Sequence, residues 1–511
     1  MTTKPRPRGL SKSKLLEYRQ CPRRLYLSVH HPELKQESDD SQQNFATGNE
    51  VGEIARTLHP EGILIEQQSL SAALRETVTL LAEKPRRPLF EATFQHSGLL
   101  VRADLLLPAK RGWHLVEVKS SCEVKPYHLE DAAIQTHVLR SSGINVASVA
   151  IQHINKQFVY PGKDCYHQVK RNGEINSLFM QEDVTGKLDE LIGEVPKWVS
   201  GAQATLAGKM PPPTGDCEKP FPCPFQEFCY PAESQPEYPV TLLPQANGKK
   251  IAANLLEQGY VDLRDVPQAL LKNETHQRIW KVTRTGKHYL GKGAAVILSA
   301  LPYPRYFLDF ETINPAVPTW KGTFPYQQVP FQWSCHIQRR TGKLDHKMFL
   351  DLSGNDPSRS CAETLIGTLG KRGPVFVYYQ SFEIGRLKEL AARYADLAEE
   401  LEAIIKRIVD LLPIAREHYY HPDMMGSWSI KAVLPTIAPD LDYANLEEVQ
   451  DGGAAQAAYL EAIHPETMVD RKREREKQLR VYCERDTGAM VRLAQFLTTG
   501  KTATTKRRKI P

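Results

Sequence analysis

Two neighbouring stretches that read as β-strands, 99–107 and 113–119, carry acidic and basic residues among apolar ones. Side chains two residues apart on a strand share a face, so Glu117 and Lys119 should project together. The turn at 108–112 is short enough for a hairpin, which would place Asp104 opposite Glu117. Two carboxylates can share a divalent cation, and a lysine beside them can help to deprotonate an attacking water. The spacing therefore predicts metal-dependent hydrolysis, although charges on a strand can also simply face solvent.

The segment after this hairpin adds polar residues to the same candidate site. A helix is expected over 128–140, where Asp131 and Gln135 are four residues apart and share a face. Glu91, just before the first strand, is a candidate accessory acid. The order of these elements is an acid-bearing strand, a Glu-Val-Lys strand and then a glutamine-bearing helix. This order favours a catalytic role for the charged residues over mere exposure to solvent.

A second candidate site combines a strand with a distant helix. On the strand expected over 305–313, Asp309 and Glu311 share one face and apolar neighbours take the other. Near the carboxyl end, Tyr482 and Asp486 are four residues apart in a helical pattern and share a face. Two acids on an otherwise apolar strand are poorly explained by solvation. They are well explained as ligands of paired cations that stabilise the attacking and leaving oxygens of a phosphodiester.

Four cysteines form a candidate ligand group. Nine cysteines in 511 residues are too few for a disulfide scaffold and odd in number, which favours a reducing compartment and metal ligation. Cys217, Cys223 and Cys229 cluster in a Pro-rich loop, and Cys21 lies far upstream. Four thiolates suit Zn²⁺ or a 4Fe–4S cluster, and the five-residue gaps differ from the short gaps of structural zinc knuckles. Unligated buried cysteines are the remaining interpretation.

The elements that must position these residues fall into two α/β patterns. The first contains a helix expected over 11–30 and the strands already described, and the second begins at the strand over 305–313. We therefore expect the α/β class, with two α/β domains joined by a small helical segment. The expected boundaries are a first domain over 1–235, a helical linker over 236–297, a second domain over 298–500 and a basic tail over 501–511.

Composition narrows the class of protein. The chain has 66 Lys and Arg against 60 Asp and Glu, a net charge of +6, with 41% hydrophobic and 25% charged residues. These values exclude collagen-like, low-complexity and mostly disordered proteins. No apolar run approaches the ~18 residues of a membrane span, and the amino end lacks the apolar core of a secretory signal. We expect a cytoplasmic protein with no membrane partner, whose basic tail would attract phosphates.

The first set of motifs resembles the RecB-type PD-(D/E)xK nucleases. Asp104 matches the motif aspartate, Glu117 and Lys119 match the E-x-K, and Gln135 matches the glutamine of the following helix. An upstream cysteine with three more near the end of the domain is similar to the iron–sulfur RecB/AddB-type members. The resemblance implies a restriction-endonuclease-like core and a 4Fe–4S cluster on Cys21, Cys217, Cys223 and Cys229. That cluster would clamp the ends of the domain and would not serve redox catalysis.

The second set resembles the DnaQ-like DEDD exonucleases with a ribonuclease-H-like fold, in the variant that carries a tyrosine. Asp309 and Glu311 match the D-x-E, and Tyr482 and Asp486 match the Y-x3-D. Glu383 stands where the family has its second aspartate. The resemblance implies Mg²⁺ or Mn²⁺ on the four acids.

Further residues belong to this second resemblance. Asp410 resembles a supporting acid of the family. The whole chain also resembles an uncharacterised bacterial family that joins both domains. Three residues near its signature segments could contact nucleic acid or serve packing; these are His418, His421 and Trp428.

Taken together, the patterns predict a metal-dependent nuclease acting on DNA or RNA, with single-stranded or frayed ends favoured. A role in repair or in defence against foreign nucleic acid follows from the resemblance. One alternative is a nucleic-acid-binding or scaffold protein with a degenerate site. Gly52, where the first family has an upstream histidine, and Glu383, one methylene longer than aspartate, support that alternative. Another is an iron–sulfur redox sensor.

Overall fold

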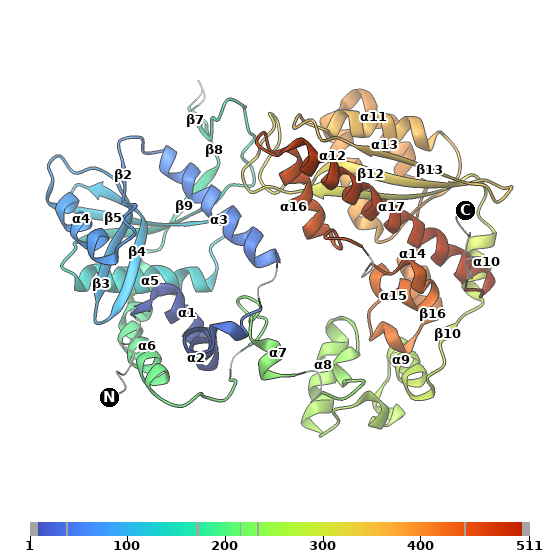
Figure 1. Ribbon diagram of the computed structural model, residues 1–511, viewed down its shortest axis with the longest axis horizontal. Helices are drawn as coiled ribbons and strands as arrows, with labels where there is room; N and C mark the ends of the chain where they lie inside the picture. Colours follow the sequence, from blue (N-terminus) through green and yellow to red (C-terminus); the bar gives the residue numbers. More distant parts are fainter. Residues whose placement is uncertain are drawn as a thin grey trace. The chain divides into compact units, whose positions relative to one another are not determined.

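The computed structural model describes residues 9–36, 39–169, 173–214, 216–231, 235–443 and 446–502. The chain divides into two compact units (Figure 1). The first comprises 1–232 and 314–327, and the second comprises 233–313 and 328–511. Both mix helices and strands, so the α/β class predicted from the sequence is confirmed. Most of the expected basic tail lies outside the described residues.

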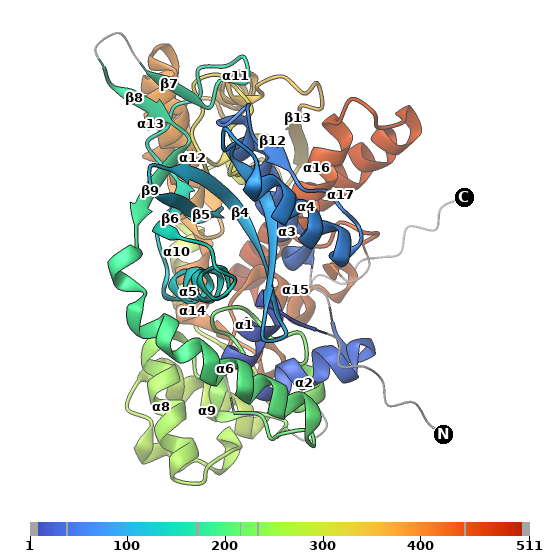
Figure 2. The ribbon, with the colours of Figure 1, turned by 90° about the vertical axis from the view of Figure 1, so that its left-hand side faces the viewer.

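The first unit is built around a mixed sheet with strand order β2-β3-β4-β5-β6-β9, and β1 pairs with β4. Helices α5 and α6 lie next to each other beside it (Figure 2). The strands of this unit are β1 (Leu10–Ser11), β2 (Ile63–Leu64), β3 (Leu89–His96), β4 (Leu99–Ala109), β5 (Gly112–Lys119), β6 (Val146–Ile154), β7 (His167–Val169), β8 (Ile175–Ser177) and β9 (Phe179–Asp183). The helices are α1 (Lys12–Gln20), α2 (Pro22–His30), α3 (Asp39–Thr57), α4 (Leu70–Ala82), α5 (Pro126–Ser141), α6 (Asp189–Ala207) and α7 (Gln226–Cys229).

The predicted hairpin is present. Strands β4 and β5 pair in antiparallel fashion from Ala109 opposite Gly112 back to Leu105 opposite Val116. The next pair away from the turn is Asp104 and Glu117, so the two acids lie opposite each other on adjacent strands, as the sequence analysis expected.

The expected single helix over 11–30 is wrong, because the structure has two helices there. Helix α1 ends at Gln20, Cys21 is extended with φ −162° and ψ 122°, and Pro22 begins α2. The residue before a proline is biased away from the helical conformation, which explains the break. The break leaves Cys21 between two helix ends, at the position where a ligand group was predicted.

The second unit contains a five-stranded sheet in the order β13-β12-β11-β14-β15. Strand β11 is antiparallel to β12 and parallel to β14. Its strands are β10 (Tyr289–Leu290), β11 (Arg305–Ile313), β12 (Val329–Gln338), β13 (Leu344–Leu350), β14 (Val375–Val377), β15 (Ile408–Asp410) and β16 (Tyr419–Tyr420). Its helices are α8 (Gln245–Glu257), α9 (Glu274–Thr285), α10 (Gly293–Ser299), α11 (Ser358–Leu369), α12 (Gln380–Arg393), α13 (Ala398–Ile405), α14 (Leu411–His418), α15 (Ile430–Ile437), α16 (Gly452–Ile463) and α17 (Val469–Thr499).

The two faces of β11 pack against different helices. Tyr306, Leu308 and Phe310 belong to a core with residues of α11, α12 and α13. The alternate residues face the other side, where α17 contacts β11 and β12. Because strand side chains alternate between faces, this arrangement turns Asp309 and Glu311 toward α17.

The connection between β11 and β12 belongs to the first unit. Residues 314–327 are grouped with it, and Ala316 and Val317, 2% and 3% exposed, pack in its core with Val51 of α3 and Phe158. The Tyr326 hydroxyl donates a hydrogen bond to the carbonyl of Ser120. The sequence analysis did not anticipate this excursion. The helical segment expected over 236–297 is present and is grouped with the second unit.

Candidate active sites

In the first unit, three acids form a row across neighbouring strands. The β3–β4 register pairs Phe90 with Leu105 and Ala92 with Ala103, which places Glu91 beside Asp104. Glu117 of β5 lies on the other side of Asp104. Glu91 has φ +56°, a strained value for a residue with a side chain. Such strain is concentrated at functional sites, where surrounding contacts maintain it.

Two lysines occupy the space between the acids. Lys119 Nζ lies 2.7 Å from Glu117 Oε1 and also contacts Asp131 of α5. Lys12, the first residue of α1, reaches the same two acids at 3.0 and 2.9 Å. Glu117 and Asp131 are 1% and 4% exposed, so both ion pairs are largely shielded from water. The sequence analysis did not identify Lys12, because nothing in its neighbourhood of the sequence links it to a hairpin a hundred residues away.

Gln135 and Asp104 complete the first site. The Gln135 amide donates to Glu117 Oε2 and, at 3.2 Å, to Asp131 Oδ1, while its own Oε1 is buried without a hydrogen-bond partner among the described residues. Asp104 Oδ2 accepts a hydrogen bond from the Val118 amide at 2.8 Å. The structure therefore brings Asp104, Glu117, Lys119 and Gln135 together, and an unpaired acceptor oxygen remains beside them.

Burial and mutual repulsion set the charges of this site. Burial, together with Asp104 and Asp131, raises the pKa of Glu117 to about 7. Burial also raises the pKa of Asp104, partly offset by Lys12 and Lys119. Although burial opposes its ionisation, the two ammonium groups hold the pKa of Asp131 well below its usual range. An added cation beside Glu117 would therefore favour its charged form.

The four predicted ligand cysteines converge in the first unit. Each of Cys21, Cys217, Cys223 and Cys229 is partly buried. Burial first, and then the other three sulfurs, raises the pKa of Cys217, which shows that the four thiols are neighbours. Within the loop, the Cys223 amide donates to the Cys217 carbonyl at 2.7 Å. The side-chain amide of Gln20 holds this loop to α1 by donating to the carbonyls of Asp216 and Phe221 at 2.9 and 2.8 Å. Among the described residues, no three of these sulfurs lie within 4.8 Å of one another.

In the second unit, Asp309 and Glu311 of β11 face α17. Their carboxylate oxygens and the Cys483 sulfur all lie within 4.8 Å of one another, an arrangement that could hold a metal ion. Glu311 is 7% exposed and Cys483 is fully buried. Cys483 was not among the predicted site residues. It follows Tyr482 directly in α17.

Glu383, in the first turn of α12, is the third acid. It is 1% exposed, and its Oε2 has no hydrogen-bond partner among the described residues. Glu383 and Asp309 are close enough for Glu383 to raise the pKa of Asp309. Asp410 has a different role. Its carboxylate accepts hydrogen bonds from the amides of Tyr379 and Gln380 at 3.0 Å, which fixes the start of α12, and from the Leu412 amide at 2.9 Å, which caps α14.

Asp486 of α17 is the fourth acid and is held by a tyrosine that the sequence analysis missed. The Tyr443 hydroxyl donates a hydrogen bond to Asp486 Oδ1. Tyr482, the predicted tyrosine, packs edge-on to Tyr443 with ring centroids 6.2 Å apart. Lys431 Nζ lies 5.5 Å from the Tyr443 ring centroid and 5.9 Å from that of Tyr482. No local pattern links Tyr443 or Lys431 to the acids in the sequence.

All four acids have raised pKa values. Burial, followed by neighbouring carboxylates, raises the pKa of Asp309 and of Glu311 well above the usual range. Burial raises the pKa of Glu383 to about 8. Burial raises the pKa of Asp486 to about 6, although Tyr443 and Lys431 favour its charged form. Four acids in such an environment would ionise together only with added positive charge, which is the property of a divalent cation site.

The remaining predicted residues lie elsewhere in the second unit. Trp428 is 4% exposed and its indole donates to the Tyr419 carbonyl at 2.8 Å, which supports the packing interpretation. His421 Nδ1 accepts from the Asp423 amide at 3.2 Å, and His418 ends α14.

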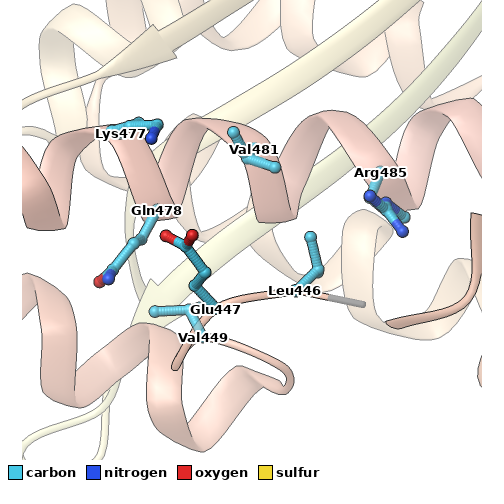
Figure 3. A pocket seen from close by; sticks show the side chains of 7 residues that line it. All are labelled: Leu446, Glu447, Val449, Lys477, Gln478, Val481 and Arg485. Carbon is cyan, nitrogen blue, oxygen red and sulfur yellow. The ribbon is translucent and has the colours of Figure 1, made fainter. Parts of the chain in front are cut away.

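A pocket of about 220 Å³ also opens beside α17 (Figure 3). Its lining comes from α17 and the 446–449 segment and includes none of the four acids; the residues are Leu446, Glu447, Val449, Lys477, Gln478, Val481 and Arg485. Among the described residues, no helix combines the length and apolar character needed to span a membrane.

Comparison with known proteins finds relatives without an assigned activity. Residues 306–429 match a domain of unknown function, DUF2779. An uncharacterized protein of Ureaplasma parvum, UU173, is 26% identical over 251 residues, which cover 45% of this chain and 36% of that protein. An uncharacterized MG366 homolog of Mycoplasma pneumoniae is 28% identical over 235 residues, 40% of this chain and 35% of that protein. The chain thus spans about a third of the length of these relatives, and no solved structure matches it.

Lys12→Ala should destabilise the first unit, because it leaves Glu117 and Asp131 buried with a single lysine between them. Removing one partner of a buried ion pair costs about 3 kcal/mol or more. Chemical denaturation, followed by a probe in the first unit, would measure the loss. Lys14→Ala on the same helix is the matched control, since Lys14 forms none of these ion pairs. Equal stability of the two variants would contradict a stabilising role of the buried cluster.

The second unit should lose stability as pH rises and regain it with divalent cations. With the pKa of Glu383 raised from 4.5 to about 8, the folded protein binds more protons than the unfolded chain in that interval, so the free energy of unfolding falls with pH. Cations compete with these protons, so Mn²⁺ should raise Tm more at pH 8 than at pH 6. Glu383→Gln should reduce both effects, and Asp470→Asn, on a side chain 94% exposed, should reduce neither. An increase in Tm independent of pH would argue against cation binding at these acids.

Proposed function

We propose that the protein is a metal-dependent nuclease, with the hydrolytic centre of the second unit as its best-supported site. The observation that carries the proposal is the convergence of Asp309, Glu311, Glu383 and Asp486 from β11, α12 and α17 in one cluster, in which Asp309 is half-buried and the other three acids are buried. A fold has little reason to gather four carboxylates in a largely buried cluster unless cations join them. Mg²⁺ and Mn²⁺ prefer such oxygen ligands.

The donor atoms of this cluster suit that group of ions. Glu383 Oε2 is a buried acceptor without a partner among the described residues, and Gln332, opposite Glu311 on β12, has an unpaired Oε1. A pair of divalent ions would stabilise the attacking and leaving oxygens of a phosphodiester. The strand order β13-β12-β11-β14-β15 supports the ribonuclease-H-like fold that the resemblance implies.

Side chains around the acids can orient the reacting groups. Tyr443 holds one oxygen of Asp486 and leaves the other available as a ligand. Tyr482 lies close enough to Asp309, Glu311 and Asp486 for these carboxylates to raise its pKa, so it would remain a neutral hydroxyl able to position water. The Lys431 ammonium lowers the pKa of Glu311 and Asp486 and can face a phosphate oxygen.

The first unit is proposed as a second nuclease site of PD-(D/E)xK type. Asp104 and Glu117 would hold a cation, and Lys119 would offset negative charge in the transition state. Lys12 favours a second candidate role for this unit. Because Lys12 and Lys119 already neutralise Glu117 and Asp131, the site is electrostatically satisfied by the protein itself, as expected of a nucleic-acid-binding unit with degenerate chemistry.

The cysteine group is proposed to hold a 4Fe–4S cluster. Tetrahedral Zn²⁺ with Zn–S bonds of about 2.3 Å requires sulfurs roughly 3.8 Å apart. The five-residue gaps between Cys217, Cys223 and Cys229 also differ from the short gaps of structural zinc knuckles. A 4Fe–4S cluster, which binds each thiolate on a different iron, suits four cysteines without that knuckle spacing. Its position between α1 and the 217–229 loop supports a structural role.

The proposed substrate is DNA or RNA, with single-stranded or frayed ends favoured by the resemblance to exonucleases. Participation in repair or in defence against foreign nucleic acid rests on that resemblance alone.

Nuclease activity can be tested with end-labelled single- and double-stranded DNA and RNA in Mg²⁺ or Mn²⁺. We expect stepwise release of nucleotides that Asp309→Asn abolishes, because this carboxylate lies at the centre of the acid cluster. Lys119→Ala should leave trimming intact and remove any internal cutting contributed by the first unit. Asp470→Asn on α17 is the matched control and should cleave like the parent. Trimming by Asp309→Asn at the parental rate would show that the second unit is a binding module.

Protein purified without oxygen should contain iron and acid-labile sulfide and absorb in the visible range. Cys217→Ser or Cys229→Ser should remove the absorption and lower stability, because each removes a thiolate ligand. Cys361→Ser alters a fully buried cysteine of the second unit and should keep the iron. Stoichiometric zinc without iron would contradict the cluster.

A further inference from the structure

Tyr379 combines backbone strain with an exposed aromatic ring. Its φ is +83° and ψ is 68°, in the left-handed region that side chains other than those of Asn and Asp rarely adopt. The residue is 58% exposed, so packing of the ring does not explain why the position holds a tyrosine. Glycine or asparagine would adopt this backbone at lower cost.

The surrounding structure maintains the strained conformation. Asp410, at the end of β15, accepts hydrogen bonds from the amides of Tyr379 and Gln380 at 3.0 Å each, and from the Leu412 amide at 2.9 Å. Two of these bonds fix the backbone at the end of β14 and the start of α12, and the third caps α14, so Asp410 ties the two helix starts together. Residues held in this way are concentrated at ligand clamps and active sites.

Tyr379 is also close to the acid cluster along the chain. It is the N-cap of α12, and Glu383 lies four residues on, about 6 Å along the helix axis. Glu383 is 1% exposed, and its unpartnered Oε2 independently marks this end of α12 as facing a ligand. An exposed ring one helical turn from a metal-binding carboxylate suits the base of a nucleotide whose phosphate is at the acids.

From these observations we infer that the ring of Tyr379 is the stacking platform for the terminal nucleobase of a single-stranded nucleic acid bound in the second unit. The inference rests on the proposed function and specifies which part of the substrate the second unit recognises, namely an unpaired terminal base. Stacking on aromatic rings is tolerant of sequence because every base offers a π-face. A base can reach such a platform only when it is unpaired, which would exclude the interior of a duplex.

Binding can be separated from hydrolysis by replacing Mg²⁺ with Ca²⁺ and following the fluorescence anisotropy of labelled eight-nucleotide single strands. Tyr379→Asn keeps a residue suited to the backbone and removes the ring, so it should fold normally and bind about tenfold more weakly. Tyr379→Phe should bind within about twofold of the parent. Tyr289→Asn, at another exposed tyrosine of the second unit, is the matched control and should not alter binding.

An abasic nucleotide at one end of the strand tests which base the ring contacts. At the bound end it should weaken binding to the parent by the same tenfold or so and should have no further effect on Tyr379→Asn, because both changes remove one stacking contact. The inference would be overturned if the abasic nucleotide, at either end of the strand, weakened binding to Tyr379→Asn as much as it weakens binding to the parent. It would also be overturned if Tyr379→Asn bound with parental affinity, or if the parent did not bind. Failure of the proposed function is separate: the parent would then bind in a Tyr379-dependent way without cleaving in Mg²⁺ or Mn²⁺.

Discussion

The repulsion between buried carboxylates is the constraint on which both candidate sites depend. Each unit places several acids where water cannot screen them, and each must therefore supply or attract positive charge. The first unit supplies it internally, through Lys12 and Lys119. In the second unit Lys431 offsets only part of the charge of Glu311 and Asp486. The same electrostatic problem thus has two solutions in one chain, and this difference makes the second unit the better candidate for a cation site.

In both units, a helix links a residue of the acid cluster to a contact outside that cluster. In the first, the nine-residue helix α1 has Lys12 at its first residue and Cys21 at its end, so the lysine of the acid site and a cysteine of the ligand group lie on one rigid segment. In the second, Asp410 fixes the first turn of α12, and this turn carries Glu383. Cys21 and Asp410 are therefore positioned to influence Lys12 and Glu383 through the backbone.

Periodicity predicted the parts of the structure that repeat locally. The alternation in 305–313 predicted β11 and the common face of Asp309 and Glu311, and the short turn predicted the β4–β5 hairpin. Lys12 and Tyr443 could not be predicted in this way, because their partners are brought near only by tertiary packing. The break at Cys21 had a local signal in Pro22, which the apolar helical pattern on either side obscured.

Residues 314–327 make the two units inseparable by any single cut of the chain. The polypeptide leaves β11, contributes Val317 to the core of the first unit, and returns as β12. The match to the family of unknown function, over 306–429, includes this excursion but ends before Asp486 on α17. A gene segment with those limits would therefore encode part of each unit and a complete version of neither, so any fragment meant to fold on its own must avoid cutting between β11 and β12.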